Sequence, residues 1–150
     1  MNIKKMFTAL SAMVVAVTMT LPSASVFGAE YSQELQDAYK WAHEKGVTTM
    51  DSIDNANMYG AITRAEMAKM LSVYAKEVLG KTLNTSAACT FTDIASLKNS
   101  DLHDYVIESC QLGIMGQNMP RNEFRPYDTI SRAEFGTALS RVLWGSENEG

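Results

Sequence analysis

The sequence has no excess of positive charge. Its 150 residues carry 13 lysines and arginines against 17 acidic residues, for a formal net charge of −4. A protein that binds nucleic acid without regard to sequence needs a basic surface, so we expect no nucleic-acid partner. The composition is not extreme either, because 46% hydrophobic and 20% charged residues are ordinary values for a globular domain. Disorder, a collagen-like chain and a multi-pass membrane protein are therefore excluded.

Motifs that mark common enzymes and metal sites are also absent. The sequence contains no G-x-S-x-G, no H-E-x-x-H and no phosphate-binding loop. A glycosidase needs two carboxylates that converge on one bond, but the acidic residues show no spacing that marks such a pair. His43, His103 and the two cysteines lack the CxxC or HxxxH spacing of metal ligands. We expect a protein that is not an enzyme and holds no metal or cofactor.

The N-terminal residues 1–29 resemble an export signal. Lys4 and Lys5 precede an uncharged segment of 16 residues, and small residues follow, which is the pattern of a cleaved signal peptide. A membrane anchor is the alternative, but a span needs about 20 apolar residues. Cleavage could follow Ser25, Gly28 or Ala29, and the last would leave 121 residues with a net charge of −6. No later segment could cross a membrane, so we expect a secreted protein without a stable membrane span.

The only cysteines, Cys89 and Cys110, lie 21 residues apart in the mature chain. An oxidising compartment favours a disulfide between them, and closing a loop of that size would stabilise the fold by about 3 kcal/mol. Two buried free thiols are the alternative.

An internal repeat organises the mature chain. Residues 62–67 read ITRAEM and residues 130–135 read ISRAEF, an offset of 68, while residues 41–47 and 108–114 are related at an offset of 67. Repeats of this kind are supersecondary units that stack on one another. We therefore predict a mainly α fold of two tandem helix–loop–helix units packed as a partial pseudo-symmetric helical bundle. The units span residues 30–82 and 83–145, and a polar tail covers residues 146–150.

The second helix of each unit begins at a predicted capping box, formed by Thr63 with Glu66 and by Ser131 with Glu134. In such a box the hydroxyl accepts from a backbone N–H three residues on, and the carboxylate accepts from the N–H of the capping residue. Apolar residues at helical spacing then predict an inward-facing stripe on each helix. The two stripes are Met67, Met70, Leu71, Tyr74 and Val78, and Phe135, Ala138, Leu139, Val142 and Leu143.

The first helix of each unit is predicted to end at a glycine, Gly46 in unit one and Gly113 in unit two. The second helices are predicted to end near Gly80 and Gly145. The loop over residues 113–126 is dense in turn residues, and we expect its Phe124 to insert into a core.

The second unit resembles an S-layer homology domain. Residues 91–93 (FTD) match the F-x-D opening of that family, Gly113 and Gly116 its turn, residues 124–126 (FRP) its F-x-P, and residues 130–135 its I-T-R-A-E-F signature. The first unit carries the signature at residues 62–66 but lacks F-x-D and F-x-P. Three such repeats usually assemble with pseudo-threefold symmetry, so two repeats imply a missing third repeat, a sufficient pair or an association of copies.

The resemblance implies an anchoring module that binds pyruvylated, anionic secondary cell-wall polysaccharide and so places the protein at the cell surface, in the cell wall or S-layer. Arginine suits that role because its guanidinium pairs with a carboxylate through two parallel bonds. Four of the five arginines of the mature chain lie between residues 121 and 141. The ligand-binding residues that we expect are Arg64, Arg132, Trp41, Thr63, Ser131, Gly113, Gly116 and Arg125.

Structural explanations exist for several of these residues. Arg64 and Arg132 lie at helix starts, where an arginine can simply be solvated or pair with Asp128, and Trp41 could be a core residue. Glu66 and Glu134 are expected to cap helices. The alternative function is a secreted helical module on the cell surface that binds a protein partner or itself through an apolar face left open.

Overall fold

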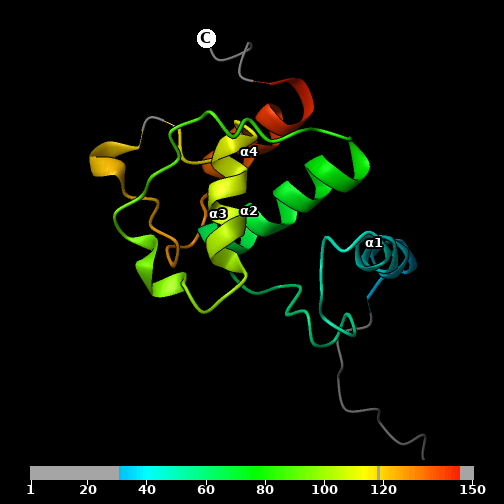
Figure 1. Cartoon of the computed structure of the whole chain (residues 1–150). Helices are drawn as coiled ribbons and strands as arrows, with labels where there is room; N and C mark the ends of the chain where they lie inside the picture. The colour runs from blue at the N-terminus through cyan, green and yellow to red at the C-terminus, as the bar shows by residue number, and fades with distance from the viewer. Residues whose placement is uncertain (1–30, 118, 146–150) are drawn as a thin grey trace, which may run out of the picture. The chain divides into compact units, whose positions relative to one another are not determined.

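The computed structural model describes residues 31–117 and 119–145. Its helices are α1 (Gln33–Glu44), α2 (Arg64–Val73), α3 (Leu102–Gln111) and α4 (Arg132–Trp144) (Figure 1). Shorter helical segments are η2 (Tyr74–Val78), which continues α2 as a π-helical turn, η3 (Ile94–Leu97) and η4 (Pro120–Asn122). The prediction of a mainly α fold is confirmed. The predicted signal peptide and polar tail lie outside the described residues, and no helix within them is long and apolar enough to cross a membrane.

Both predicted capping boxes are present. The Thr63 hydroxyl accepts from the Glu66 backbone N–H, and the Glu66 carboxylate accepts from the Thr63 backbone N–H at 2.7 Å. Ser131 and Glu134 form the same arrangement at the start of α4. Each box satisfies backbone N–H groups that have no partner within the helix, which explains why both helices begin at the residue after the cap.

The main helix packing joins the two units. α3 of unit two packs along α2 of unit one (Figure 1), and α4 contacts α2 less extensively. The ammonium groups of Lys69 in α2 and Lys76 in η2 pair with the Asp101 and Glu108 carboxylates, respectively, both at 2.6 Å. Buried apolar side chains from both units form one core, which comprises Ala65, Met67, Ala68, Leu71, Ala75, Ile94, Leu97, Val106, Ile114, Met115, Phe124, Ala138 and Val142.

The loop of unit two also covers the start of α2. The Arg64 backbone N–H donates to the Asp128 carbonyl oxygen at 2.9 Å, and the Ala65 N–H donates to that of Pro126 at 3.0 Å. A single antiparallel bridge joins Thr63 and Thr129. Two backbone donors that lack partners inside α2 are thus satisfied by the other unit, so the two units depend on each other for a complete fold.

Phe124 inserts into the core as expected and is fully buried. Asp93, the acid of the F-x-D opening, holds the loop in place because its carboxylate accepts from the Phe124 and Arg125 backbone N–H groups at 2.9 and 2.6 Å. Gly116 has a φ of +84°, and a β-carbon there would lie 2.6 Å from the Phe91 ring. Both its conformation and this close approach require glycine.

The predicted disulfide is present. Cys89 and Cys110 are bonded, with their Cα atoms 5.8 Å apart. The bond ties the segment before η3 to the C-terminal part of α3. The alternative of two free thiols is therefore excluded, and a disulfide is compatible with an extracellular location.

The predicted inward stripe of α4 is only half correct. Ala138 and Val142 are buried, but Phe135 and Leu143 are 40% and 41% exposed. The reason is that α3 packs against α2, so among the described residues nothing closes over this side of α4.

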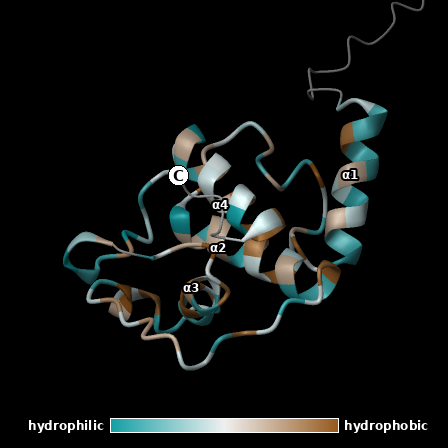
Figure 2. Cartoon of the chain, turned by 90° about the horizontal axis from the view of Figure 1, so that it is seen from above, coloured by the Kyte–Doolittle hydropathy of each residue, from teal (hydrophilic) through white to brown (hydrophobic). Residues whose placement is uncertain are grey.

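In Figure 2, α1 shows hydrophobic and hydrophilic bands along its length, and none of its residues is buried. The expected glycines do lie at the helix ends, since Gly46, Gly80, Gly113 and Gly145 all have positive φ.

Candidate functional site

Arg64, the first residue of α2, lies in the junction between the two units. It is only 4% exposed. Its Nε–H donates to the Phe124 carbonyl oxygen at 2.8 Å, its guanidinium lies 5.3 Å from the centre of the Phe124 ring, and it pairs with the Glu134 carboxylate. Burial lowers the pKa of Arg64, an effect that the nearby Glu134 opposes. An arginine stays charged in proteins, so this junction holds a buried positive charge.

Glu134 connects the capping box of α4 to two arginines. Its Oε2 accepts from the Ser131 backbone N–H at 2.9 Å, while its Oε1 pairs with Arg64 and accepts from Arg125 at 3.0 Å. The hydrogen bond from the Ser131 backbone holds the pKa of Glu134 below its ordinary value of 4.5, and the two arginines lower it further. The carboxylate is therefore charged at neutral pH and neutralises one of the two arginines that it contacts.

A cavity of about 230 Å³, which we call the Arg64 pocket, opens beside this cluster. Arg64, Glu134 and Arg141 supply its charged groups, and Thr137 adds a hydroxyl. The Arg141 guanidinium also donates to the Ile114 carbonyl oxygen at 3.3 Å. The charged side chains that line the pocket are thus two arginines and one carboxylate, and the Glu134 carboxylate also binds Arg125, which in turn pairs with Asp128.

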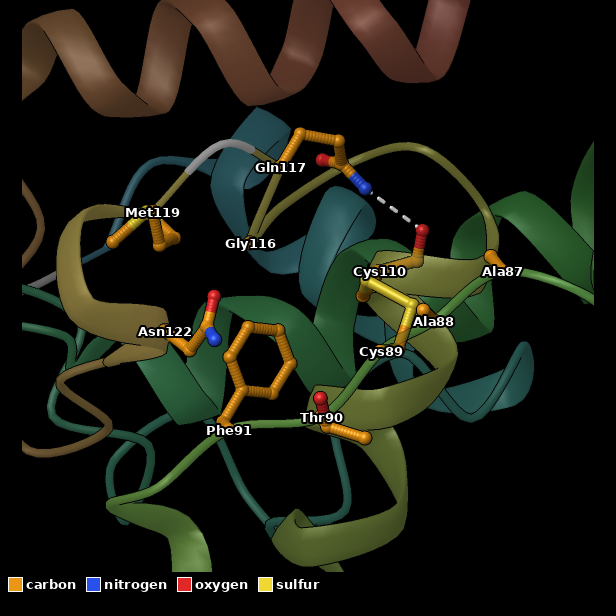
Figure 3. Close-up of a pocket in the computed structure, with 10 residues that line it drawn as sticks. All are labelled: Ala87, Ala88, Cys89, Thr90, Phe91, Cys110, Gly116, Gln117, Met119 and Asn122. Carbon is orange, nitrogen blue, oxygen red and sulfur yellow. Dashed lines mark hydrogen bonds between the residues drawn. A yellow bond between two sulfur atoms is a disulfide. The ribbon is translucent and has the colours of Figure 1, made fainter.

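A second cavity of about 350 Å³, the disulfide pocket, lies next to the first. The Cys89–Cys110 bond, Phe91 and Asn122 line it, and Figure 3 shows the Gln117 side chain reaching toward Cys110 above it. The Gln117 amide nitrogen donates to the Cys110 carbonyl oxygen at 2.8 Å. Its amide oxygen is buried and has no hydrogen-bond partner within the described residues. The two pockets share Gly116, Gln117 and Met119 in their linings.

The structure brings together some of the expected ligand-binding residues. Arg64 and Gly116 line the Arg64 pocket, and Arg125 contacts it through Glu134. The Thr63 and Ser131 hydroxyls are occupied in the capping boxes. Gly113 ends α3 and lines neither pocket.

The other two expected residues lie outside both pockets. The Arg132 side chain is exposed on α4. Trp41 lies on α1 with its ring 6.3 Å from that of Tyr74, and it stays 43% exposed. It is therefore neither a buried core residue nor part of the Arg64 pocket.

The sequence reasoning did not assign Arg141, Thr137 or Gln117 to the site. Arg141 and Thr137 lie on α4 four residues apart, so they share one helix face with each other. The spacing of four residues is visible in the sequence. The sequence alone does not show that this face lies beside Arg64, because Arg64 is 77 positions before Arg141.

We predict that Glu134→Gln destabilises the fold at neutral pH more than Glu66→Gln does. Glutamine keeps both capping geometries, so the comparison isolates the charge that Glu134 presents to buried Arg64. Removing one partner of a fully buried pair costs 3–5 kcal/mol, and because Glu134 is partly exposed we expect about 1–2 kcal/mol. Denaturant unfolding at several pH values measures the difference.

The pH dependence has a defined sign. The folded-state pKa of Glu134 is lowered. The stability that its carboxylate adds to the fold is therefore fully present above the unfolded-state pKa of about 4.5, and it is lost as the pH falls below that value. The difference in free energy of unfolding between wild type and Glu134→Gln should therefore become smaller below pH 4.5. Equal effects of the two substitutions at pH 7 would show that the contact with Arg64 contributes nothing.

Within the part of the chain that the structure describes, no three histidine, cysteine or acidic side chains are grouped so as to hold a metal ion. The chain matches no protein-family model, no curated protein and no solved structure.

Proposed function

We propose that this protein binds a carboxylate-bearing polysaccharide of the cell envelope without catalysis and so holds itself at the cell surface. The observation that carries the proposal is that Arg64 and Arg141 line one pocket together with Glu134, whose carboxylate also binds the half-exposed Arg125. Positive charge gathered at one site can attract an anion to a protein that is acidic overall. The resemblance of the second unit to S-layer homology domains points to the same ligand class.

The contacts assign different tasks to the three arginines. Arg64 is buried and bound to Phe124 and Glu134, so it acts mainly through its charge. Arg125 is more accessible, because its side chain is 46% exposed, and its pairing with Asp128 at 3.4 Å is long. A carboxylate on the ligand can exchange with such a partner and form two parallel bonds with the guanidinium. Arg125 is therefore one side chain that we assign to the ligand, and Arg141 is the other because it lines the Arg64 pocket.

The two adjoining pockets suit successive units of a polymer. Pockets that enclose small molecules usually measure about 300–1,000 Å³; the Arg64 pocket is smaller, at about 230 Å³, and the disulfide pocket, at about 350 Å³, is at the lower end of that range. We assign one charged sugar unit to it, while the adjoining disulfide pocket offers the Asn122 amide and the Phe91 ring to a neighbouring unit. A chain of sugars could in this way use both.

We predict that the purified chain without residues 1–29 sediments with cell-wall sacculi, and that the Arg125→Gln, Arg141→Gln double variant binds at least tenfold more weakly. Each charge-assisted hydrogen bond contributes about 1.5–3 kcal/mol, and a tenfold change corresponds to about 1.4 kcal/mol. A co-sedimentation isotherm with circular dichroism of each variant measures binding and folding separately. Binding should also weaken as salt increases.

Arg121→Gln is the matched control. The Arg121 side chain is 81% exposed, pairs only with Glu123 among the described residues, and lines neither pocket. The Arg121→Gln variant should bind the sacculi like wild type.

Arg132→Gln tests the resemblance to S-layer homology domains separately, because Arg132 is the signature arginine that is exposed outside the pockets. A wild-type protein that stays in the supernatant, or a double variant that sediments as well as Arg121→Gln, would overturn the assignment.

A further inference from the structure

The two repeated helices α2 and α4 differ in what covers them. At the internal offset of 68, the face of α2 that is buried corresponds on α4 to residues that are mostly exposed. On α2 and its continuation η2 this face consists of Arg64, Ala65, Met67, Ala68, Leu71, Ser72 and Ala75, all buried. On α4 the counterparts are Arg132, Ala133, Phe135, Gly136 and Leu143, which are exposed, and Leu139 and Ser140, which are half-buried. The same helix face is thus closed in unit one and open in unit two.

Unit two closes the face of α2 through α3 and its loop. The pairs that mark the contact are Lys76 with Glu108 and the Ser72 hydroxyl with the Tyr105 carbonyl oxygen, 3.5 Å apart. The loop accepts the Arg64 and Ala65 backbone N–H groups. Among the described residues, no acceptor contacts the corresponding N–H groups at the start of α4, those of Arg132 and Ala133.

The counterpart of α3 within the repeat is α1, and its corresponding face is partly open: Tyr39 and Ala42, the counterparts of buried Val106 and Ser109, are half-buried. At the offset of 67, Tyr105 and Glu108 correspond to Ala38 and Trp41. Ala38 is exposed, Trp41 is 43% exposed, and α1 has no buried residue. The helix that should cover a face like that of α4 is therefore present in the chain with part of its own face exposed, although the Trp41 ring contacts Tyr74 edge-on.

The two open faces are complementary. Where η2 and α3 place the Lys76–Glu108 ion pair, α4 and α1 carry Trp144 and Trp41. Trp144 is 65% exposed, and two tryptophans brought together would bury apolar surface that each leaves in water. The charges also match, because α1 has three acidic residues and one lysine while α4 has two arginines and one glutamate.

We infer that copies of this chain associate head to tail, with α1 of one copy covering the face of α4 of the next as α3 covers α2. The occupant of the open face is a second copy of the chain, because α1 repeats the helix already seen to close such a face. Contacts of this kind use two different surfaces, so they build rings or open chains rather than two-fold dimers. The inference does not depend on the proposed polysaccharide binding.

A complementation experiment tests this geometry. Leu143→Glu places a charge on the α4 face, and Ala38→Glu places one on the α1 face; both side chains are exposed, so each variant should fold alone. The average molar mass of wild type in analytical ultracentrifugation should rise with protein concentration. Each variant should have an association constant at least tenfold lower than that of wild type. An equimolar mixture of the two variants should form a heterodimer and no larger assembly. The only intact pair of faces is then the α1 face of Leu143→Glu with the α4 face of Ala38→Glu.

Leu79→Glu is the control, since Leu79 is 39% exposed and lies on neither face; it should associate like wild type. Circular dichroism checks that all variants are folded. Wild type that stays monomeric at every concentration would overturn the inference and leave the open face to a different partner. Association that Leu143→Glu abolishes and the mixture does not restore would also overturn it, because that result indicates a two-fold contact between α4 helices.

Discussion

Phe124→Ala is expected to lower the free energy of unfolding by about 3–5 kcal/mol, the range for truncating a buried phenylalanine. The Phe124 side chain is fully buried. Its ring packs edge-on against Phe91 with the centroids 5.3 Å apart, and the Arg64 guanidinium lies over it. The substitution would leave a cavity where the loop of unit two meets α2, and it would loosen the carbonyl that Arg64 binds. A domain of this size has only about 5–15 kcal/mol of stability in total.

Phe135→Ala is the matched control, because it is the same substitution at a phenylalanine that is 40% exposed. It should cost less than about 1 kcal/mol. Denaturant unfolding of both variants at a dilution where the chain is monomeric measures the two effects. Similar losses for the two would mean that Phe124 is not the residue that seals the junction between units.

Removing the disulfide is the second large effect. Cys89→Ser with Cys110→Ser should lower the free energy of unfolding by about 3 kcal/mol, because the unfolded chain regains the entropy of an open loop of 21 residues. The folded state should lose little besides, since Val106 and Ile114, which lie on either side of Cys110, remain buried in the core. Thermal and denaturant unfolding of the double variant measure the loss.

Reduction of wild type by dithiothreitol should have the same effect as the double substitution. The double variant itself should not respond to the reductant. A wild type whose unfolding midpoint is unchanged on reduction would contradict the assignment of a stabilising disulfide. Because the segment with Cys89 lines the disulfide pocket, reduction should also weaken the proposed binding of polysaccharide.

Features that depend on neighbouring residues were predictable from the sequence. The capping boxes of α2 and α4 need only a hydroxyl and a carboxylate three residues apart, and both are present. The helix ends at Gly46 and Gly113 need only a residue that tolerates positive φ. The burial of Phe124 followed from a large apolar side chain in a loop otherwise rich in turn residues. The caps and helix ends rest on interactions within a few residues of the chain, whereas the partners that bury Phe124, among them Phe91 and Arg64, are distant in the sequence.

The candidate site could be predicted only in part. Arg64, Gly116 and Arg125 were expected near a ligand, and they do lie at or beside the Arg64 pocket. The contribution of Arg141 was missed because nothing near it in the sequence shows that it faces Arg64. A motif identifies the type of residue at a position, whereas the distance between residues far apart in the chain depends on how the helices pack.

The sequence by itself determined two repeated helical units, their caps and glycine ends, and two cysteines placed to pair. Only the tertiary structure decided that α3 packs on α2 of the other unit, that Arg64 is buried against Glu134 while its repeat Arg132 is exposed, and that one face of α4 stays open. The physical reason is that helical periodicity shows which side of a helix is apolar but not which partner covers it. Two helices with the same signature therefore acquired different environments, because only one of them has a following unit packed against it in the described chain.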